Sequence, residues 1–420
     1  MLGERADIRI NSRPIRYSEN GFRTVTAEET VRKIENLFLT TGFEITSEQR
    51  WVENTPFSYY IFHFLSPEGS QADKIYIGKG FSENQCTASA AMEFVERFCA
   101  QRFGDEPVVE ASYNQLKDKA RDPSLFILPG DSCYTPDLQL EWIWGYSLTY
   151  EEPVLVPANF IFLPYTAGRP SQYIADFDSN GLATGNCLEE AILHGLLEVV
   201  ERDARMIIEY NRLVMPDLEP DLADEEPLAR FFGELSSCAI KAWAKNIATD
   251  IPIPSIGIFL KGNCKNKPVY SYASGCYLSP RIALSRALTE ALQLYPRCEN
   301  YKQWLNSGPI SYLYDKSEKR IKFSALEDLS SDDLKENILS CVAILKEFEA
   351  EVIVVDLSRK EMVFPVVRVC VTNLQPVVFG QSPRLSQRIF EVPLILGHRN
   401  HALKPEDIKP RNLCGMMWKK

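Results

Sequence analysis

The sequence predicts a mixed α/β fold in which sheets pack against helices. Segments rich in β-branched and aromatic residues occur in pairs, and helical segments separate the pairs along the 420 residues. No low-complexity segment or flexible linker divides the chain. Hydrophobic residues make up 45% of it, which is ample for a large core. We therefore expect one continuous α/β unit with an N-terminal extension.

The first helix is expected over residues 26–41, after about twenty irregular residues. Thr26 and Glu29 have the spacing of a capping box, apolar residues recur on one face, and Gly42 follows as a terminator. Residues 57–65 and 74–77 are rich in strand-forming residues and predict two strands. Residues 84–103 predict a second helix, which carries acidic residues.

The rest of the chain continues the alternation of strand pairs and helices. A strand pair is expected over 140–150 and 153–165, and an apolar helix with acidic residues over 187–212. An acidic, proline-bearing connection (216–227) then leads to an amphipathic helix that continues to about residue 246. The remaining expected elements are strands 253–261 and 268–276, helices 280–295 and 331–349, and buried strands 352–356 and 366–371.

The pattern Glu-x-x-Glu-Arg occurs twice, ending at Arg97 and at Arg202, each time inside an otherwise apolar helix. At about 100° per residue, Glu190, Glu198 and Glu201 fall within an arc of roughly 80°. Buried carboxylates must be paired, protonated or bound to metal. Two such helices facing one cavity would hold divalent cations. The alternative is a solvated face with ordinary i,i+4 ion pairs.

A third helix carries Arg286 and Glu290 on one face, and arginine is the usual partner of phosphate. The set therefore points to a nucleoside triphosphate with magnesium, although a buried Arg–Glu pair within this helix is the alternative. No Walker pattern occurs in the sequence. We interpret Gly78-Lys79-Gly80 as a turn with a solvated lysine, and His194 as a hydrogen-bonded neighbour rather than a base.

Composition excludes several classes of function. The net charge of -11 argues against a nucleic-acid binder, and no apolar run has the length of a membrane span. The N-terminus lacks the apolar core of a signal peptide. The 11 cysteines include no C-x-x-C pair, so we expect reduced thiols, a cytoplasmic location and no zinc site.

Residues 179–203 (SNGLATGNCLEEAILHGLLEVVERD) resemble the signature of the YcaO family. Shorter segments at 78–80, 88–97 and 285–290 fall in the family's order, so the resemblance spans most of residues 20–400. It implies a YcaO-type α/β fold whose ATP site is lined by acidic helices without a Walker loop. It also implies three parts: an N-terminal extension (1–65) that contributes to the nucleotide site, the YcaO domain (66–400) and a C-terminal tail (401–420).

The resemblance assigns roles to particular side chains. ATP and Mg²⁺ are the implied cofactors, and the implied Mg²⁺ ligands are Glu93, Glu96, Glu198 and Glu201. The implied nucleotide contacts are Arg23, Thr30, Ser89, Asn186, Glu190, Arg202, Arg286 and Glu290. Among these, Arg202, Arg286 and Glu290 are expected to act on the phosphates during catalysis.

The implied activity is ATP-dependent phosphorylation of a backbone amide oxygen in a peptide or protein, after which a nucleophile replaces that oxygen. The residues 412–420 lack the P-x-P-x-P tail of many azoline-forming members, which favours thioamide formation over cyclodehydration of Cys, Ser or Thr. We also expect a TfuA-type or ubiquitin-activating-like partner and a homodimer. Two other classes stay open, a nucleotide-binding scaffold that stimulates a partner and a structural protein with buried ion pairs.

Overall fold

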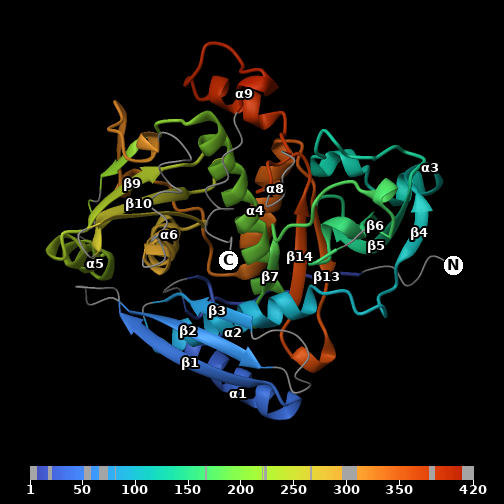
Figure 1. Ribbon diagram of the computed structural model, residues 1–420, viewed down its shortest axis with the longest axis horizontal. Helices are drawn as coiled ribbons and strands as arrows, with labels where there is room; N and C mark the ends of the chain where they lie inside the picture. Colours follow the sequence, from blue (N-terminus) through green and yellow to red (C-terminus); the bar gives the residue numbers. More distant parts are fainter. Residues whose placement is uncertain are drawn as a thin grey trace.

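Three β-sheets and the helices packed against them make up the described part of this chain (Figure 1). The computed structural model describes residues 7–17, 21–51, 58–65, 74–80, 82–165, 168–219, 221, 225–264, 267–295, 310–377 and 384–408. The mixed α/β class expected from the sequence is confirmed. The long helix α4 (Leu188–Asn211) lies between the sheets, so its sequence decides much of the core.

The N-terminal sheet has the order β1-β2-β3 and is antiparallel, with β1 (Glu44–Trp51), β2 (Ser58–Leu65) and β3 (Lys74–Gly78). Helices α1 (Ala27–Thr41) and α2 (Glu83–Cys99) pack on it. The ring of Phe64 on β2 stacks on Phe94 of α2 with centroids 4.6 Å apart. The predicted capping box between Thr26 and Glu29 is present at the start of α1, and Gly42 ends the helix in the left-handed region.

The second sheet has the order β11-β10-β9-β8-β12. Its strands are β8 (Asp217–Glu219), β9 (Lys241–Asn246), β10 (Ser255–Cys264), β11 (Lys267–Cys276) and β12 (Arg320–Lys322). Helix α6 (Pro280–Leu294) follows β11 directly and packs back on β10 and β11, as a short connection requires. Helix α5 (Glu226–Ser237) packs beside β9.

The third sheet has the order β4-β5-β13-β14-β7, and β6 pairs with β5. Its strands are β4 (Val109–Ser112), β5 (Gln139–Ser147), β6 (Glu152–Pro157), β7 (Leu182–Thr184), β13 (Val352–Asp356) and β14 (Val366–Val371). β14 is buried at every position, because α4 covers it. The remaining helices are α3 (Tyr113–Leu116), α8 (Leu334–Glu347), which packs beside α4, and α9 (Arg388–Ile395).

Gly195 allows α4 to lie directly on the third sheet. A Cβ at this position would stand 2.7 Å from the carbonyl oxygen of Gly181 and 2.9 Å from Cγ2 of Val369. Contacts that short do not occur without displacement of the backbone, so a glycine is needed where the helix crosses the sheet. This close approach fixes the height of the acidic residues of α4 relative to the sheet.

Two expected elements are wrong in extent. The second half of the helix expected up to residue 246 is strand β9, because Ala239 takes a positive φ of 56° that reverses the chain. The strand expected over 153–165 ends at Pro157, where a 3-10 turn begins. Strand β1 and helix α9 were not predicted: β1 is polar and largely exposed, and α9 contains Pro393.

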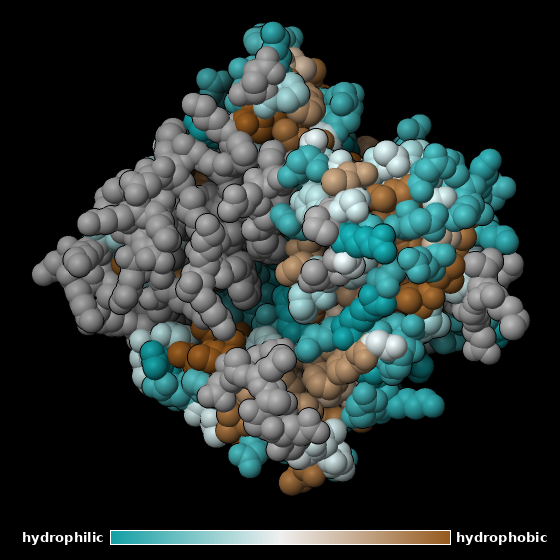
Figure 2. Space-filling model, turned by 45° about the vertical axis from the view of Figure 1, so that its right-hand side comes forward, coloured by the Kyte–Doolittle hydropathy of each residue, from teal (hydrophilic) through white to brown (hydrophobic). Residues whose placement is uncertain are grey.

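The hydropathy of the described surface is mixed. On the face shown in Figure 2, hydrophobic residues lie in small groups among hydrophilic ones. No helix among the described residues combines the length and the apolarity that crossing a bilayer requires. Most of the expected C-terminal tail, residues 409–420, lies outside the described residues.

Candidate active site

Each of three helices presents one half-buried polar stripe, and most of the other side chains of α4 and α6 are buried. On α4 the residues that stay partly accessible are Leu188, His194, Glu198 and Arg202, and the last three are spaced four residues apart. The matching stripes are Ser89, Glu93 and Glu96 on α2, and Arg286, Glu290 and Gln293 on α6. Residues four apart lie one above the other on a helix, so each stripe is a continuous line of polar groups. Charged groups on the three helices affect one another's pKa, so the three stripes line the same region of the molecule.

The carboxylates of α2 and α4 lie within electrostatic range of one another. Arg97 lies 3.7 Å from Glu93 and 3.6 Å from Glu96, and Arg202 lies 3.7 Å from Glu198. Burial raises the pKa of Glu96 to about 8, opposed by Arg97 and reinforced by the charges of Glu198 and Glu93. Repulsion between these carboxylates is what a divalent cation placed between them would relieve.

The donor set fits Mg²⁺ in kind, since carboxylate oxygens on rigid helices are its usual protein ligands. Arg97 and Arg202 now neutralise part of the charge at 3.6 to 3.7 Å, too long for tight hydrogen bonds. Within the described part of the chain, no three carboxylate, His or Cys side chains already converge as a finished metal site. A cation between α2 and α4 would therefore require these side chains to change rotamer.

Glu201 and Glu290 bring α4 and α6 together. The hydroxyl of Ser274 on β11 donates to Glu201 at 2.7 Å, and Lys79 lies 3.0 Å from Glu290. Burial raises the pKa of Glu201, opposed by Arg202 and reinforced by Glu290. Burial also opposes ionisation of Glu290, but Lys79 and Arg202 outweigh it and lower the pKa of Glu290 to about 2. Glu290 is thus ionised and held by two cations.

Lys79 corrects the interpretation of Gly78-Lys79-Gly80 as a turn with a solvated lysine. Its ammonium group pairs with Glu290, and its side chain is only 33% exposed. The tight turn places it there: a Cβ on Gly78 would stand 2.0 Å from the carbonyl oxygen of Cys86, so only glycine fits between β3 and α2. The two glycines in the sequence indicated a tight turn at Lys79, but no local pattern indicated that Glu290 would be the partner of Lys79.

Glu190 ties the N-terminal extension to α4. Its buried carboxylate accepts from the backbone N–H and the hydroxyl of Thr24, both at 2.7 Å. It also accepts from the backbone N–H of Asn186 at 2.9 Å and from the Asn186 amide at 3.2 Å. The hydroxyl of Thr30 on α1 donates to Asn186 Oδ1 at 3.1 Å. Thr24 was not predicted, because 166 residues separate it from Glu190.

Arg286 takes His194 as its partner, not Glu290, so the alternative of an Arg–Glu pair within α6 is wrong. A guanidinium nitrogen of Arg286 lies 2.8 Å from His194 Nε2, and the guanidinium stands over the ring of Tyr277 at 5.7 Å. Because a guanidinium only donates, Nε2 is the acceptor and the imidazole is neutral. Burial, followed by Arg286 and Arg23, lowers the pKa of His194 well below its usual range. The interpretation of His194 as a hydrogen-bonded neighbour is confirmed.

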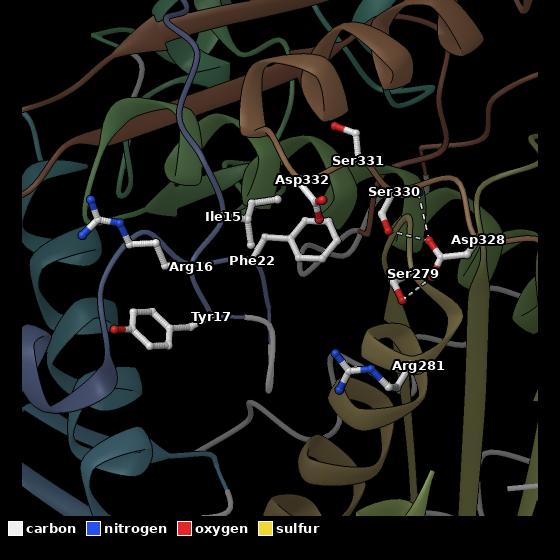
Figure 3. Close-up of a pocket in the computed structure, with 10 residues that line it drawn as sticks. All are labelled: Ile15, Arg16, Tyr17, Phe22, Ser279, Arg281, Asp328, Ser330, Ser331 and Asp332. Carbon is white, nitrogen blue, oxygen red and sulfur yellow. Dashed lines mark hydrogen bonds between the residues drawn. The ribbon is translucent and has the colours of Figure 1, made fainter. Parts of the chain in front are cut away.

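An open pocket lies between the N-terminal segment and the start of α6 (Figure 3). It encloses about 600 Å³ including its mouth, and its lining includes Tyr17, Phe22, Ser279 and Asp328. Ser279 donates to Asp328 at 2.9 Å, and the backbone N–H of Phe22 donates to the hydroxyl of Tyr277 at 2.8 Å. Since Tyr277 lies under Arg286, this pocket adjoins the polar stripe of α6.

The predicted site residues are thus brought together from four parts of the chain: the N-terminal segment, α2, α4 and α6. Ser89 lies one turn before Glu93 on the stripe of α2, and Arg23 lies near enough to His194 to act on its charge. Three further participants were not predicted, namely Thr24, Ser274 and Tyr277. All three are neutral residues whose types are common everywhere, so only the fold identifies them.

Comparison with known proteins gives this geometry a family. A model of YcaO cyclodehydratases, described as ATP- and Mg²⁺-binding, matches residues 77–375. The chain belongs to the YcaO family. The resemblance seen in the sequence, the fold that it implied, and ATP and Mg²⁺ as the family's cofactors are therefore confirmed.

Relatives and solved structures agree with this assignment. An uncharacterized protein from Methanothermobacter thermautotrophicus is 30% identical over 78% of this chain and 89% of its own length. A protein in the tfuA 3' region of Rhizobium leguminosarum bv. trifolii is 27% identical over 55% of this chain and 57% of its own length.

Among solved structures, YcaO from Methanopyrus kandleri bound with AMPPCP and Mg²⁺ matches with a TM-score of 0.67 and 26% identity, over 89% of this chain and 98% of that one. A heterocyclase in complex with substrate and cofactor matches with a TM-score of 0.83 and 25% identity, over 97% of this chain. This chain spans only 59% of that heterocyclase, so the relative has further parts that are not matched here.

Proposed function

We propose that this YcaO protein uses ATP and Mg²⁺ to phosphorylate a backbone amide oxygen of a peptide or protein, so that sulfide can replace the oxygen and form a thioamide. The amide oxygen attacks the terminal phosphorus, the O–P bond forms, and the bond to ADP breaks. Hydrosulfide then attacks the amide carbon, the C–S bond forms, and the C–O bond breaks as phosphate leaves with the sulfhydryl proton. This proposal rests on one observation: carboxylates of α2 and α4 lie close enough to affect one another's charge, beside Arg202, in a family that binds ATP and Mg²⁺.

In this proposal Glu93, Glu96, Glu198 and Glu201 hold Mg²⁺, which when bound would offset negative charge on the phosphates. The chain's own cations supply the rest of the positive charge. Arg202 pairs with Glu198 and also acts on the charge of Glu290, Lys79 pairs with Glu290, and Arg286 donates to His194. Glu290 and Glu201 keep these cations in position, because each carboxylate lies close to Arg202. Electrostatic stabilisation by fixed charges is the main need of phosphoryl transfer.

Arg23, Thr30, Ser89, Asn186 and Glu190 are proposed to bind or position the nucleotide. Glu190 has four donors already, so its part is to orient Thr24 and Asn186 rather than to meet an anionic phosphate itself. Thr30 extends the same network to α1. The pocket of Figure 3 adjoins this network through Phe22, and its volume and aromatic wall suit the nucleoside end of ATP.

Thioamide formation is favoured over azoline formation by one relative. The protein from Rhizobium leguminosarum is encoded in the tfuA 3' region, which supports a TfuA-type partner for this chain as well. Two of the similar solved structures are heterocyclases, which supports the azoline alternative. Mass spectrometry of a modified peptide separates the two, because thioamide formation exchanges oxygen for sulfur while azoline formation removes water.

Release of phosphate from ATP tests the enzyme directly. We expect hydrolysis that requires Mg²⁺ and that Glu198→Gln lowers at least tenfold, since a neutral amide binds Mg²⁺ poorly. Glu234→Gln is the matched control, because Glu234 also has an i,i+4 arginine, Arg230, at 3.6 Å but lies on α5 outside the site. Equal phosphate release by Glu198→Gln and the unmodified chain would remove Glu198 from the metal set.

The alternative of a nucleotide-binding scaffold makes a different prediction for the same assay. A scaffold would be stabilised by Mg-ATP without releasing phosphate, and a purely structural protein would show neither effect. Thermal unfolding with and without Mg-ATP therefore accompanies the assay.

A further inference from the structure

A second pocket lies between α4 and β14, behind the carboxylates of the active site. Val199 and Arg202 of α4 form one wall, and Arg368 of β14 forms the other. Including its mouth, the pocket encloses about 440 Å³. Because Arg202 belongs both to this lining and to the stripe of α4, the pocket opens beside the proposed phosphorylation site.

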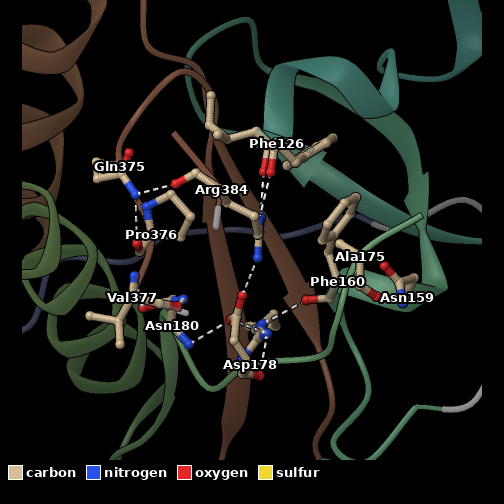
Figure 4. Close-up of polar contacts among 12 residues, drawn as sticks. Phe126, Asn159, Phe160, Ala175, Asp178, Asn180, Gln375, Pro376, Val377 and Arg384 are labelled. Carbon is tan, nitrogen blue, oxygen red and sulfur yellow. Dashed lines mark hydrogen bonds and ion pairs between the residues drawn. The ribbon is translucent and has the colours of Figure 1, made fainter. Parts of the chain in front are cut away.

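The lining carries more positive than negative charge. It contains three arginines, Arg202, Arg368 and Arg384, but only one carboxylate, Asp178. Asp178 pairs with Arg384 at 2.6 Å and with Arg368 at 3.0 Å. Figure 4 shows Arg384 and Asp178 facing one another, with Phe126 and Phe160 beside them. A site with an excess of guanidinium groups attracts an anion.

Each of the three nitrogens of Arg384 already has an acceptor within the protein. Its Nε donates to the carbonyl of Ile127 at 2.6 Å, its Nη1 donates to Asp178, and its Nη2 donates to the carbonyl of Phe126. Its role is therefore to hold the loop at Phe126 and Ile127 against Asp178.

Arg368 differs from Arg384 in one respect. Its side chain is 2% exposed; Nε donates to the carbonyl of Phe160 and Nη2 to the backbone and side chain of Asp178, each at 3.0 Å or less. Its Nη1 is buried without a hydrogen-bond partner among the described residues. A buried charged donor without an acceptor is costly, and a bound anion would supply the acceptor.

The pocket also lies near the metal-binding carboxylates. Burial raises the pKa of Glu96, and Arg368 is among the cations that oppose this rise, so its guanidinium lies within electrostatic range of α2. An anion at Nη1 of Arg368 would thus stand on the β14 side of α4, in the pocket that Arg202 also lines.

We propose that this pocket binds a small singly charged anion, and that in the reaction this anion is the hydrosulfide that attacks the activated amide. This inference rests on the proposed thioamide formation. Nη1 of Arg368 would hold the sulfur until the amide oxygen has been phosphorylated. The anion then donates its electron pair to the amide carbon, and phosphate leaves towards Arg202.

The walls of the pocket favour hydrosulfide over phosphate. Val199, Val371 and Leu374 line it with apolar carbon, and water-poor walls raise the cost of removing an anion from water. That cost grows steeply with charge, so a singly charged ion enters more easily than doubly charged phosphate. The apolar walls also strengthen the attraction of Arg368 for the ion that does enter.

Crystals of the full chain soaked in sodium bromide test the site, since bromide is a monovalent anion whose anomalous scattering locates it. We expect a peak within hydrogen-bonding reach of Arg368 Nη1 that added sodium hydrosulfide displaces and inorganic phosphate does not. Arg368→Lys, which lacks Nη1, should lower the occupancy roughly tenfold or more. Arg384→Lys, which also weakens an Asp178 pair but removes no unpaired donor, should keep the peak.

The proposal is overturned by the absence of a peak in the unmodified chain, by an equal peak in Arg368→Lys, or by displacement with phosphate alone. Should Arg368→Lys fail to fold, Val371→Phe fills the same pocket without changing its charge and must also remove the peak. Mg²⁺-dependent phosphate release from ATP is measured on the same protein without sulfide. Its loss would reject the proposed function, whereas its presence without a bromide peak would reject only the pocket.

Discussion

Replacing Lys79 by methionine removes a cation from a carboxylate that the fold keeps mostly buried. Nζ of Lys79 lies 3.0 Å from Glu290, and the two side chains are 33% and 23% exposed. Fully exposed pairs contribute under about 1 kcal/mol, whereas breaking a buried pair costs about 3–5 kcal/mol. Because this pair is partly screened by solvent, we expect Lys79→Met to lower the free energy of unfolding by about 2 kcal/mol.

The reasoning makes a sharper prediction in a double-mutant cycle with Glu290→Gln. The cost of Lys79→Met comes from the carboxylate that it leaves behind, so it should fall to about 0.5 kcal/mol once Glu290 is neutral. Urea denaturation followed by tryptophan fluorescence measures all four proteins. Equal costs of Lys79→Met in both backgrounds would refute the claim that the turn after β3 acts through Glu290.

Three more outcomes follow from the structure. Gly195→Ala should lower the free energy of unfolding by about 1–3 kcal/mol, because its Cβ would meet Val369 at 2.9 Å. The control Gly233→Ala on α5, whose Cβ would meet nothing within 4 Å, should be neutral or stabilising, and urea denaturation compares the two variants. The pKa of Glu290 is lowered to about 2 from 4.5, so its stabilisation is present above pH 4.5 and disappears as the pH falls towards 2. Relative to Glu290→Gln, the free energy of unfolding of the unmodified chain should fall by about 1 kcal/mol between pH 6 and pH 4. The same difference between the two proteins at both pH values in urea denaturation would contradict this. Mg-ATP at a hundred times its dissociation constant should stabilise the unmodified chain by about 2.7 kcal/mol in thermal unfolding, and an equal gain in Glu198→Gln would contradict the assigned role of that carboxylate.

The sequence predicted most helices because their signals are local. Thr26, Glu29 and Gly42 fix both ends of α1 within seventeen residues, and the apolar residues on nearly every side of α4 predict that it is buried. Signals failed where tertiary pairing decides the outcome. The segment Lys241–Asn246 forms a strand because Ala239 reverses the chain and β10 lies alongside. The helical pattern of the preceding residues gave no sign of this change.

The candidate site divides in the same way. Helical spacing placed Glu198 and Glu201 on one side of α4, and in the fold Glu198 stays partly accessible while Glu201 is buried. Spacing within one helix could not say that Arg286 turns to His194 while Glu290 turns to Lys79, because those partners come from other elements. Likewise, no local pattern distinguishes Arg368, which has one nitrogen without an acceptor, from Arg384, in which each nitrogen has one. Which charges meet is a property of the fold.

The central claim is that carboxylates of α2 and α4 hold the metal of a magnesium–ATP complex. The most direct measurement is a crystal structure with Mn²⁺ and AMPPCP, in which anomalous scattering locates the metal. We predict Mn²⁺ between the two helices, bound by oxygens from Glu93 or Glu96 on one side and Glu198 or Glu201 on the other. Mn²⁺ and nucleotide bound elsewhere, with these carboxylates still paired to Arg97 and Arg202, would contradict the claim.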